Sequence, residues 1–314
     1  MPSLNYGGQA VIEGVMMRGE RDWAVAVRAP NGEIVVHRQP LNQVVYRSRV
    51  FKWPFIRGLT MLWDSLGLGL RALMWSADVA MGEESEASFT GPLAWGTVAL
   101  SLGFGVALFF LLPMFLASLV DRYVASALLS NLLEGSIRLG LFLAYVWAIG
   151  FMPDIRRVFA YHGAEHKTIS AYEHGAPLEP QAVLGYSRAH TRCGTGFLLG
   201  VVVIFVLVST LMGRPPLWLR LASRIVLIPV VAGIAYEFLK LTSKYYDKSA
   251  FVRMLVAPNL ALQRLTTRDP EPEMLEVSIR ALQEVLISEG RLAQPADDQS
   301  TATDPLAGGK PAPA

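Results

Sequence analysis

The stretch TGFLLGVVVIFVLVSTLMG, residues 195–213, decides the fold class of this chain. It carries no charged residue, and its length is close to the roughly 20 residues that an α-helix needs to cross a bilayer. In the whole chain of 314 residues, 52% are hydrophobic and only 17% are charged, whereas typical soluble domains have about 25% charged residues. The sequence therefore predicts a membrane protein.

Three further stretches outside 195–213 are long and apolar enough to span a bilayer. They lie at about 94–120, 136–152 and 218–239, and the last is weakest at its start because of Arg220 and Arg224. We therefore expect a mainly α, polytopic fold with about four transmembrane helices, gathered in a membrane domain over residues 91–257.

The distribution of basic residues predicts the orientation of these spans. Lysines and arginines are frequent between the second and third spans and after the fourth, and basic segments remain in the cytoplasm. With an even number of spans, both termini then lie on that side, although Arg214, Arg220 and Arg224 in the outer loop oppose this assignment. The prediction is a multi-pass protein of the bacterial inner membrane with both termini cytoplasmic.

Composition also limits the partners. A net charge of +2 and the absence of a Lys/Arg-rich tract exclude nucleic acid as an expected partner. The expected partners are then the lipid bilayer and an unknown protein or peptide, which is either a substrate or a binding partner. Cys193 is the single cysteine, so an intramolecular disulfide is excluded.

Two segments precede the membrane domain. Residues 1–53 predict a small cytoplasmic β region, because β-rich runs flank Asn31-Gly32, a strong hairpin signal. Residues 54–90 predict an amphipathic helix lying in the membrane interface. Its charges recur every seven residues and form one polar stripe: Arg57, Asp64, Arg71 and Asp78.

Two more segments follow the membrane domain. Residues 258–292 predict a cytoplasmic C-terminal amphipathic helix. Its apolar stripe consists of Leu275, Ile279, Leu282 and Leu286. Residues 293–314 are rich in Ala, Pro, Asp and Gly without periodicity, which predicts a disordered tail.

The candidate chemistry lies in a cytoplasmic helix-loop, residues 153–194, which contains YHGAEHKTI at 161–169. Pro153 suits the first helical position and Gly175 suits the position after the helix end. At about 100° per residue, His162 and His166 share one face, and Glu165 lies about 60° from His162. This H-x-x-E-H order is the inverse of the zincin motif, in which two histidines bind a metal and the glutamate is the general base.

Several residues could complete such a site. His190 and Cys193 follow in SRAHTRCGTGF, and Glu237 interrupts the last span, where a carboxylate is a functional candidate. Each also has an ordinary interpretation: His190 as a loop residue, Cys193 as a small buried residue, and Glu237 as the ion-pair partner of a nearby lysine. The sequence leaves the third ligand open between these residues.

With these residues identified, the chain resembles the DUF1385 or YqhQ-like family of uncharacterised bacterial membrane proteins. The motifs that carry the resemblance are GGQAVIEGVMMRG (7–19), YHGAEHKTI (161–169), HTRCGTGF (190–197), AYEFLKL (235–241) and LQRLTTRDPE (262–271). Together they cover roughly residues 5 to 290. Thr191 and Gly196 depart from the family's third motif, but His190 and Cys193 are kept. The resemblance implies a metal-dependent enzyme and brings no substrate.

Two functional hypotheses follow from these residues. In the first, the protein is a membrane-embedded metal-dependent hydrolase, most simply a zinc peptidase of the inverted type, with Glu165 catalytic and the metal bound by His162, His166 and one of His190, Cys193 and Glu237. In the second, it is a non-catalytic membrane scaffold or interaction protein whose metal, bound by four protein ligands, is structural. Both predict a divalent metal, with Zn²⁺ favoured.

Overall fold

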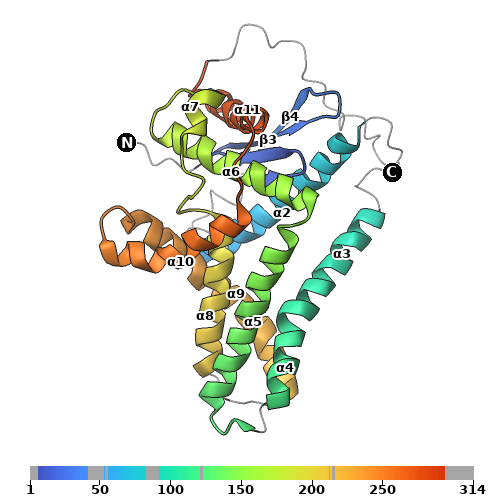
Figure 1. Cartoon of the computed structure of the whole chain (residues 1–314), viewed down its shortest axis with the longest axis vertical. Coiled ribbons are helices and arrows are strands. Elements are labelled where there is room, and N and C mark those ends of the chain that lie inside the picture. The colour runs from blue at the N-terminus through green and yellow to red at the C-terminus, as the bar shows by residue number, and fades with distance from the viewer. Residues whose placement is uncertain are drawn as a thin grey trace.

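The chain forms a helical bundle below an α/β cap (Figure 1). The structure, a computed structural model, describes residues 6–41, 53, 56–82, 92–120, 123–211, 213 and 216–293. Among these residues, four helices are long and apolar enough to cross a membrane, and a four-stranded antiparallel sheet lies near the N-terminus. The predicted mainly α, polytopic fold with a small N-terminal β region is therefore confirmed.

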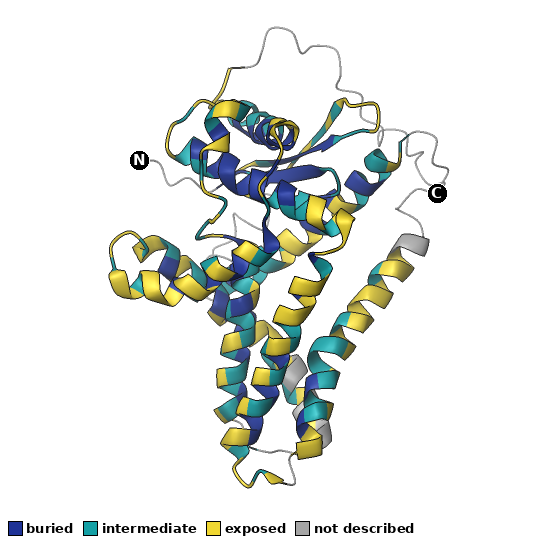
Figure 2. Cartoon of the chain, viewed as in Figure 1, coloured by how far each residue is buried: buried dark blue, intermediate teal, exposed yellow. Residues whose placement is uncertain are grey.

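The four spans are built as follows. The first span is α3 (Pro92–Val106), the π-helical turn η2 (Ala107–Leu111) and α4 (Leu112–Val120); the second is α5 (Ala127–Ile149), the third α8 (Gly194–Leu211) and the fourth lies in α9 (Leu217–Tyr245). Figure 2 shows that much of the outer surface of these helices is exposed, whereas burial concentrates in the cap. Apolar helix surface that no protein covers is suited to contact with lipid.

The second span begins at Ala127 rather than at about residue 136. The difference arises because Glu134 resembles a solvent boundary in the sequence, whereas its side chain is buried and paired with Arg138 inside the bundle. Arg138 donates to Glu134 over 2.7 Å, and its Nε donates to the carbonyl oxygen of Phe109 in η2 over 2.9 Å. Pairing of this kind is what allows ionisable residues within a span.

The sheet of the cap is an antiparallel meander in the order β1-β2-β3-β4. Its strands are β1 (Gly7–Val11), β2 (Gly14–Arg18), β3 (Asp22–Arg28) and β4 (Ile34–Pro40). The predicted hairpin at Asn31-Gly32 is confirmed as the β3–β4 turn, where Gly32 has a φ of 89°, a value that favours glycine.

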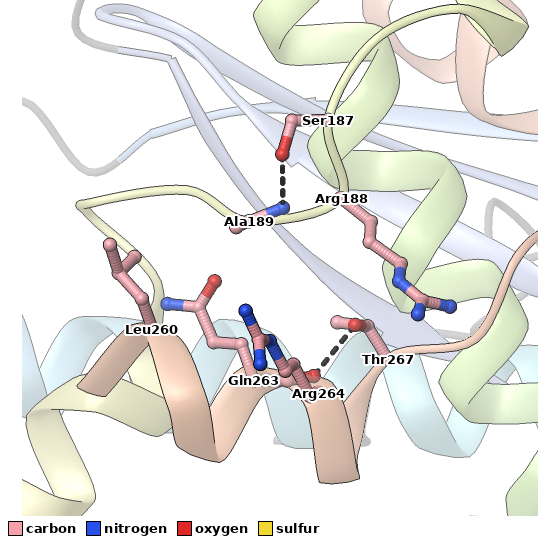
Figure 3. Close-up of a pocket in the computed structure, with 7 residues that line it drawn as sticks. All are labelled: Ser187, Arg188, Ala189, Leu260, Gln263, Arg264 and Thr267. Atoms are coloured by element: carbon pink, nitrogen blue, oxygen red, sulfur yellow. Dashed lines mark hydrogen bonds between the residues drawn. The ribbon is translucent and has the colours of Figure 1, made fainter. Parts of the chain in front are cut away.

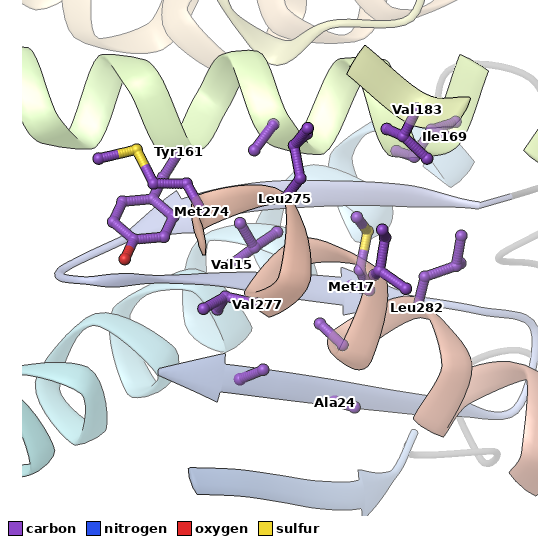
Figure 4. Packing of buried hydrophobic residues seen from close by; sticks show 14 of the residues in the cluster. Val15, Met17, Ala24, Tyr161, Ile169, Val183, Met274, Leu275, Val277 and Leu282 are labelled. Atoms are coloured by element: carbon purple, nitrogen blue, oxygen red, sulfur yellow. The ribbon is translucent and has the colours of Figure 1, made fainter. Parts of the chain in front are cut away.

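One face of the sheet is covered by helices that come from distant parts of the sequence. These helices are α6 (Pro153–Glu173), α7 (Pro180–Leu184) and α11 (Pro272–Ser288). Figure 4 shows α11 packed across the strands with α6 beside it, and the shared core includes Val15, Met17 and Leu282. The predicted apolar stripe of α11 is buried in full, so this helix is a structural part of the cap.

The opposite face of the sheet is covered by α2 (Ile56–Met81), the helix predicted over residues 54–90. Leu68 and Ala72 pack against Val25 and Val27 of β3. The polar stripe of α2 is used for contacts within the protein: Asp64 pairs with Arg18 of β2, and Arg57 pairs with a residue of α9. The sheet is thereby enclosed between two helical layers.

The segment predicted as one C-terminal helical region, 258–292, covers the end of one helix and the whole of a second. The first is α10 (Ala250–Thr266), which includes Pro258, and the second is α11. In Figure 1, α10 extends sideways at the junction between bundle and cap. The predicted disordered tail, from residue 294 onward, lies outside the described residues.

The two ends of the described chain meet in the cap. The hydroxyl of Tyr6 donates to the carboxylate of Glu289 over 2.6 Å, and the same carboxylate accepts from the backbone nitrogen of Glu20. Two spans separate β1 from α6 along the chain, and two more separate α6 from α11. Since each pair of spans returns the chain to the same end of the bundle, all three elements lie at that end. This assembly places the motifs at 7–19, 161–169 and 262–271 next to one another.

Candidate metal centre

Helix α6 has the ends that the sequence predicts. Pro153 occupies the first turn with Asp154, the helix stops at His174, and Gly175 follows with a φ of 72°. Its central part is buried on every side, however, rather than along one stripe, because the sheet, α11 and the segment after α10 surround it. Glu165 and Lys167 are therefore buried along with His166, while His162 is half-buried.

A close backbone contact fixes α6 against the segment that follows α10. A Cβ atom added to Gly163 would lie 2.0 Å from the carbonyl oxygen of Arg268. The backbone nitrogen of Arg268 donates to the carbonyl oxygen of Phe159 over 2.8 Å, which holds the two segments in register. Gly163, the residue between the two motif residues His162 and Ala164, therefore permits an approach that any side chain would prevent.

Three possible ligand atoms converge beside this contact. One atom each of His162, His166 and Cys193 lies within 4.8 Å of the other two. The Nε2 atom of His162 is 3.2 Å from the Sγ atom of Cys193. The Nε2 atom of His166 is buried and has no hydrogen-bond partner in the part of the chain that the structure describes.

Backbone carbonyls orient both imidazoles. Nδ1 of His162 lies 2.9 Å from the carbonyl oxygen of Thr266, and Nδ1 of His166 lies 2.5 Å from the carbonyl oxygen of Arg188. A carbonyl oxygen only accepts, so each Nδ1 carries the proton and each Nε2 of a neutral ring presents a lone pair. Metal-binding histidines are oriented in this way in proteins.

The charges of the cluster favour an ionised thiol. Burial raises the pKa of Cys193, but the hydrogen bond from His162 and the charges of His162 and His166 outweigh burial, and the pKa falls well below the usual thiol value. Burial conversely lowers the pKa of His162, while Cys193 outweighs burial and raises this pKa to about 9. A thiolate is the form in which cysteine binds metals, and a bound metal competes with the protons of these imidazoles.

Glu165 lies in the same buried region. Its side chain touches β1, because a Cβ atom on Gly8 would lie 2.9 Å from its Cγ atom. Burial raises the pKa of this carboxyl, and the neighbouring His166 and His162 oppose that shift. Glu165 is only 5% exposed. A buried carboxyl of this kind is a candidate for proton transfer.

His190 lies next to the cluster without joining its three atoms. The side-chain amide of Gln263 accepts from the backbone nitrogen of His190 and donates to its carbonyl oxygen, each over 2.8 Å. The rings of His190 and His166 are 5.7 Å apart between centroids, and Nε2 of His190 is 3.4 Å from Glu173. Burial lowers the pKa of His190 to about 4, so its ring is neutral near pH 7.

Glu237 does not belong to this cluster of ligand atoms. Its carboxylate accepts two hydrogen bonds from Arg57, one of them over 2.7 Å, and this pair joins α9 to α2. Of the residues that the sequence predicts as ligands, the structure thus brings together His162, His166 and Cys193, leaves His190 beside them, and engages Glu237 in an ion pair.

The sequence analysis missed four residues that shape this site. Thr266 and Arg188 contribute only carbonyl oxygens, which leave no trace in the residue type. Gln263 and Gly163, like Thr266, lie within motifs of the family resemblance, but only the fold reveals what they contact.

This arrangement fits a metal ion. Two imidazole nitrogens and a thiolate are the donors that zinc prefers, and their carbonyl partners leave the ligand atoms directed inward. The unpartnered, buried Nε2 of His166 would otherwise be an unsatisfied polar atom. The three donors leave a further coordination position to be filled.

Comparisons with known proteins agree on one family. The family described as "Protein of unknown function (DUF1385)" matches residues 53–288. The chain is also 35% identical over 293 residues to "Uncharacterized protein YqhQ" of Bacillus subtilis (strain 168), and that alignment covers 90% of this chain and 92% of the relative. No solved structure matches. Since the family match spans most of the chain, including His162, His166 and Cys193, this protein belongs to the DUF1385 family.

Proposed function

We propose that the protein is a membrane-embedded metal-dependent hydrolase whose metal is held by His162, His166 and Cys193. The observation that carries the proposal is the convergence of the three ligand atoms within 4.8 Å, with both Nδ1 atoms bonded to backbone carbonyls. Imidazole and thiolate donors favour Zn²⁺ over the hard cations Mg²⁺ and Ca²⁺, which take oxygen ligands.

Glu165 is the proposed general base. When bound, a Zn²⁺ ion would supply Lewis-acid activation of water and of a substrate carbonyl. Glu165 accepts the proton of the attacking water and delivers it to the leaving group as the scissile bond breaks. Because burial raises its pKa above the ordinary carboxyl value, Glu165 is a stronger base than an exposed carboxylate.

The proposed site lies at the cytoplasmic face of the bacterial inner membrane. Cys193 directly precedes Gly194, the first residue of the third span, so the thiol is at the end of a transmembrane helix. The basic residues that flank the spans favour the cytoplasm for the cap and both termini. A peptide or protein held at the membrane is the substrate class that this location favours.

A structural metal site in a non-catalytic scaffold is the second candidate. The observation in its favour is burial: His166 is 1% exposed and Cys193 is 6% exposed, and His190 lies beside them as a fourth donor. Four protein ligands would close the site, which is typical of structural zinc.

Metal analysis of the purified full-length protein tests the site. We expect about one zinc per chain in the wild type and in Glu165→Gln, and loss of zinc in His162→Ala. His174→Ala is the matched control, because His174 ends the same helix and is exposed, and its ring contacts the carbonyl oxygen of Ser170 and the ring of Tyr186 rather than the ligand atoms. A wild type without stoichiometric metal, or equal metal loss in the control, would refute the metal site.

A second variant separates the two candidate functions. If three ligands leave one position for substrate, His190→Ala keeps its zinc, and cobalt-substituted protein changes its visible spectrum when azide is added. If His190 is the fourth ligand, the variant loses zinc and the cobalt spectrum does not respond to azide. The second outcome would overturn the hydrolase and support the scaffold.

A further inference from the structure

A pocket lies between α10 and the loop that carries Arg188. Its volume is about 210 Å³, and its walls are Ser187, Arg188 and Ala189 on one side and Leu260, Gln263, Arg264 and Thr267 on the other. Figure 3 shows the loop passing over the last turns of α10, with both arginines among the lining side chains. Pockets for drug-sized ligands are about 300–1,000 Å³, so this volume suits a smaller group.

The pocket has an excess of positive charge. Arg188 pairs with Asp269 over 2.9 Å, and Asp269 also pairs with Lys167 over 3.7 Å. Within the described residues, no carboxylate pairs with Arg264, whose guanidinium is therefore free to bind an anion. One exposed carboxylate is thus shared by two cations while a third cation is unpaired. Guanidinium groups bind phosphate through two parallel hydrogen bonds.

The two segments that form this pocket adjoin the ends of two spans: residues 187–189 precede the third span, which begins at Gly194, and α10 follows the fourth. Helix α10 begins at Ala250, only a few residues after the fourth span ends at Tyr245, so its start lies close to the end of that span. Its outer side exposes Phe251, Met254 and Leu255. A helix with large exposed apolar side chains beside the end of a span is suited to the headgroup layer.

We propose that the pocket between α10 and residues 187–189 binds a phosphate ester anion, as carried by the headgroup of an anionic phospholipid. Arg264 provides the principal contact, Arg188 the second positive charge, and Leu260 the apolar wall. The same segments hold the candidate metal centre, since the carbonyl oxygen of Arg188 accepts from His166 and Gln263 binds the backbone of His190. This binding does not depend on the metal or on hydrolysis.

Native mass spectrometry of the full-length protein in a neutral detergent tests the proposal. The probes are phosphatidylglycerol, zwitterionic phosphatidylcholine and inorganic phosphate. We expect one tightly bound phosphatidylglycerol, and at least about tenfold weaker binding in Arg264→Gln, because a charge-assisted contact is lost. Arg253→Gln is the matched control: it removes the same charge from the same helix outside the pocket, and its affinity should stay within about twofold of wild type.

The remaining outcomes decide the source of the anion and whether the site exists. Leu260→Trp fills the pocket without removing a charge and should weaken binding as much as Arg264→Gln. Competition by inorganic phosphate at equal concentration would assign the site to a soluble phosphate ester, and lack of competition assigns it to the lipid. Equal effects of Arg264→Gln and Arg253→Gln, no effect of either, or equally tight phosphatidylcholine would overturn the proposal.

Discussion

Gly163→Ala tests whether the backbone contact between α6 and the segment after α10 supports the candidate metal centre. The new Cβ atom would lie 2.0 Å from the carbonyl oxygen of Arg268, whereas Cβ atoms essentially never come closer than 3.0 Å to such neighbours. The clashing atom belongs to the backbone, so a side-chain rotation cannot relieve it. Arg268 must move by about 1 Å, and Thr266, which orients His162, lies only two residues away.

Two opposing terms set the size of the effect. Alanine stabilises a helix interior by about 1 kcal/mol relative to glycine. Overpacking a buried site costs about 1–3 kcal/mol, and the rigid neighbour places Gly163→Ala at the upper end of that range. The net loss is about 2 kcal/mol, which corresponds to a decrease in Tm of about 4–8 °C for a domain of 150–250 residues. Disturbing the carbonyl partner of His162 should also weaken metal binding about 10- to 100-fold.

Both effects can be measured on the purified protein. Thermal unfolding in detergent, followed by tryptophan fluorescence, gives the Tm, and titration against a zinc chelator gives the metal affinity. Gly185→Ala is the control, because its Cβ atom would have no neighbour closer than 3.9 Å. An unchanged Tm and unchanged zinc affinity in Gly163→Ala would refute the role assigned to this contact.

Three further predictions concern other parts of the molecule. Glu237→Gln should leave the zinc content unchanged, because Glu237 pairs with Arg57; zinc loss in metal analysis would contradict this placement. In the metal-free protein, burial raises the pKa of Glu165, so the folded state binds that proton more tightly and stability falls as pH rises above the usual carboxyl pKa. Glu165→Gln should remove this contribution to the dependence of the unfolding free energy on pH, which denaturant unfolding at several pH values measures. The same pH dependence in wild type and variant would contradict the prediction. Leu282→Ala, at a fully buried position of α11, should cost about 2–5 kcal/mol in the same assay, whereas a loss below about 1 kcal/mol would contradict its place in the core.

The spans and the ends of α6 could be predicted from sequence because they depend on local chemistry. Long apolar runs without charges are stable as helices in a bilayer, and Pro153 and Gly175 determine where the helix beside them begins and ends. The start of α5 could not be predicted, because hydropathy counts Glu134 as a charge and does not show that Arg138 neutralises it. The packing of α11 on the sheet could not be predicted either, because an apolar stripe on a helix does not indicate which surface it packs against.

The candidate site shows the same division. Helical spacing placed His162 and His166 on one face, and the motif that follows supplied Cys193, so the ligands themselves were within reach of sequence reasoning. The sequence left Cys193, His190 and Glu237 as alternatives, because choosing among them requires distances across the fold. The role of Gly8 beneath Glu165 also depends on contact between β1 and α6, far apart along the chain.

The contact between Tyr6 and Glu289 has a consequence for biogenesis. The cap combines strands made at the start of translation with a helix made near its end, and four spans are inserted in between. One apolar face of the sheet therefore remains uncovered until α11 has been synthesised. Thr266 is synthesised only shortly before α11. Contacts between residues so distant in sequence form slowly. A nascent chain interrupted before residue 266 would be anchored in the bilayer yet lack the complete metal centre, so only fully synthesised and inserted chains could become functional.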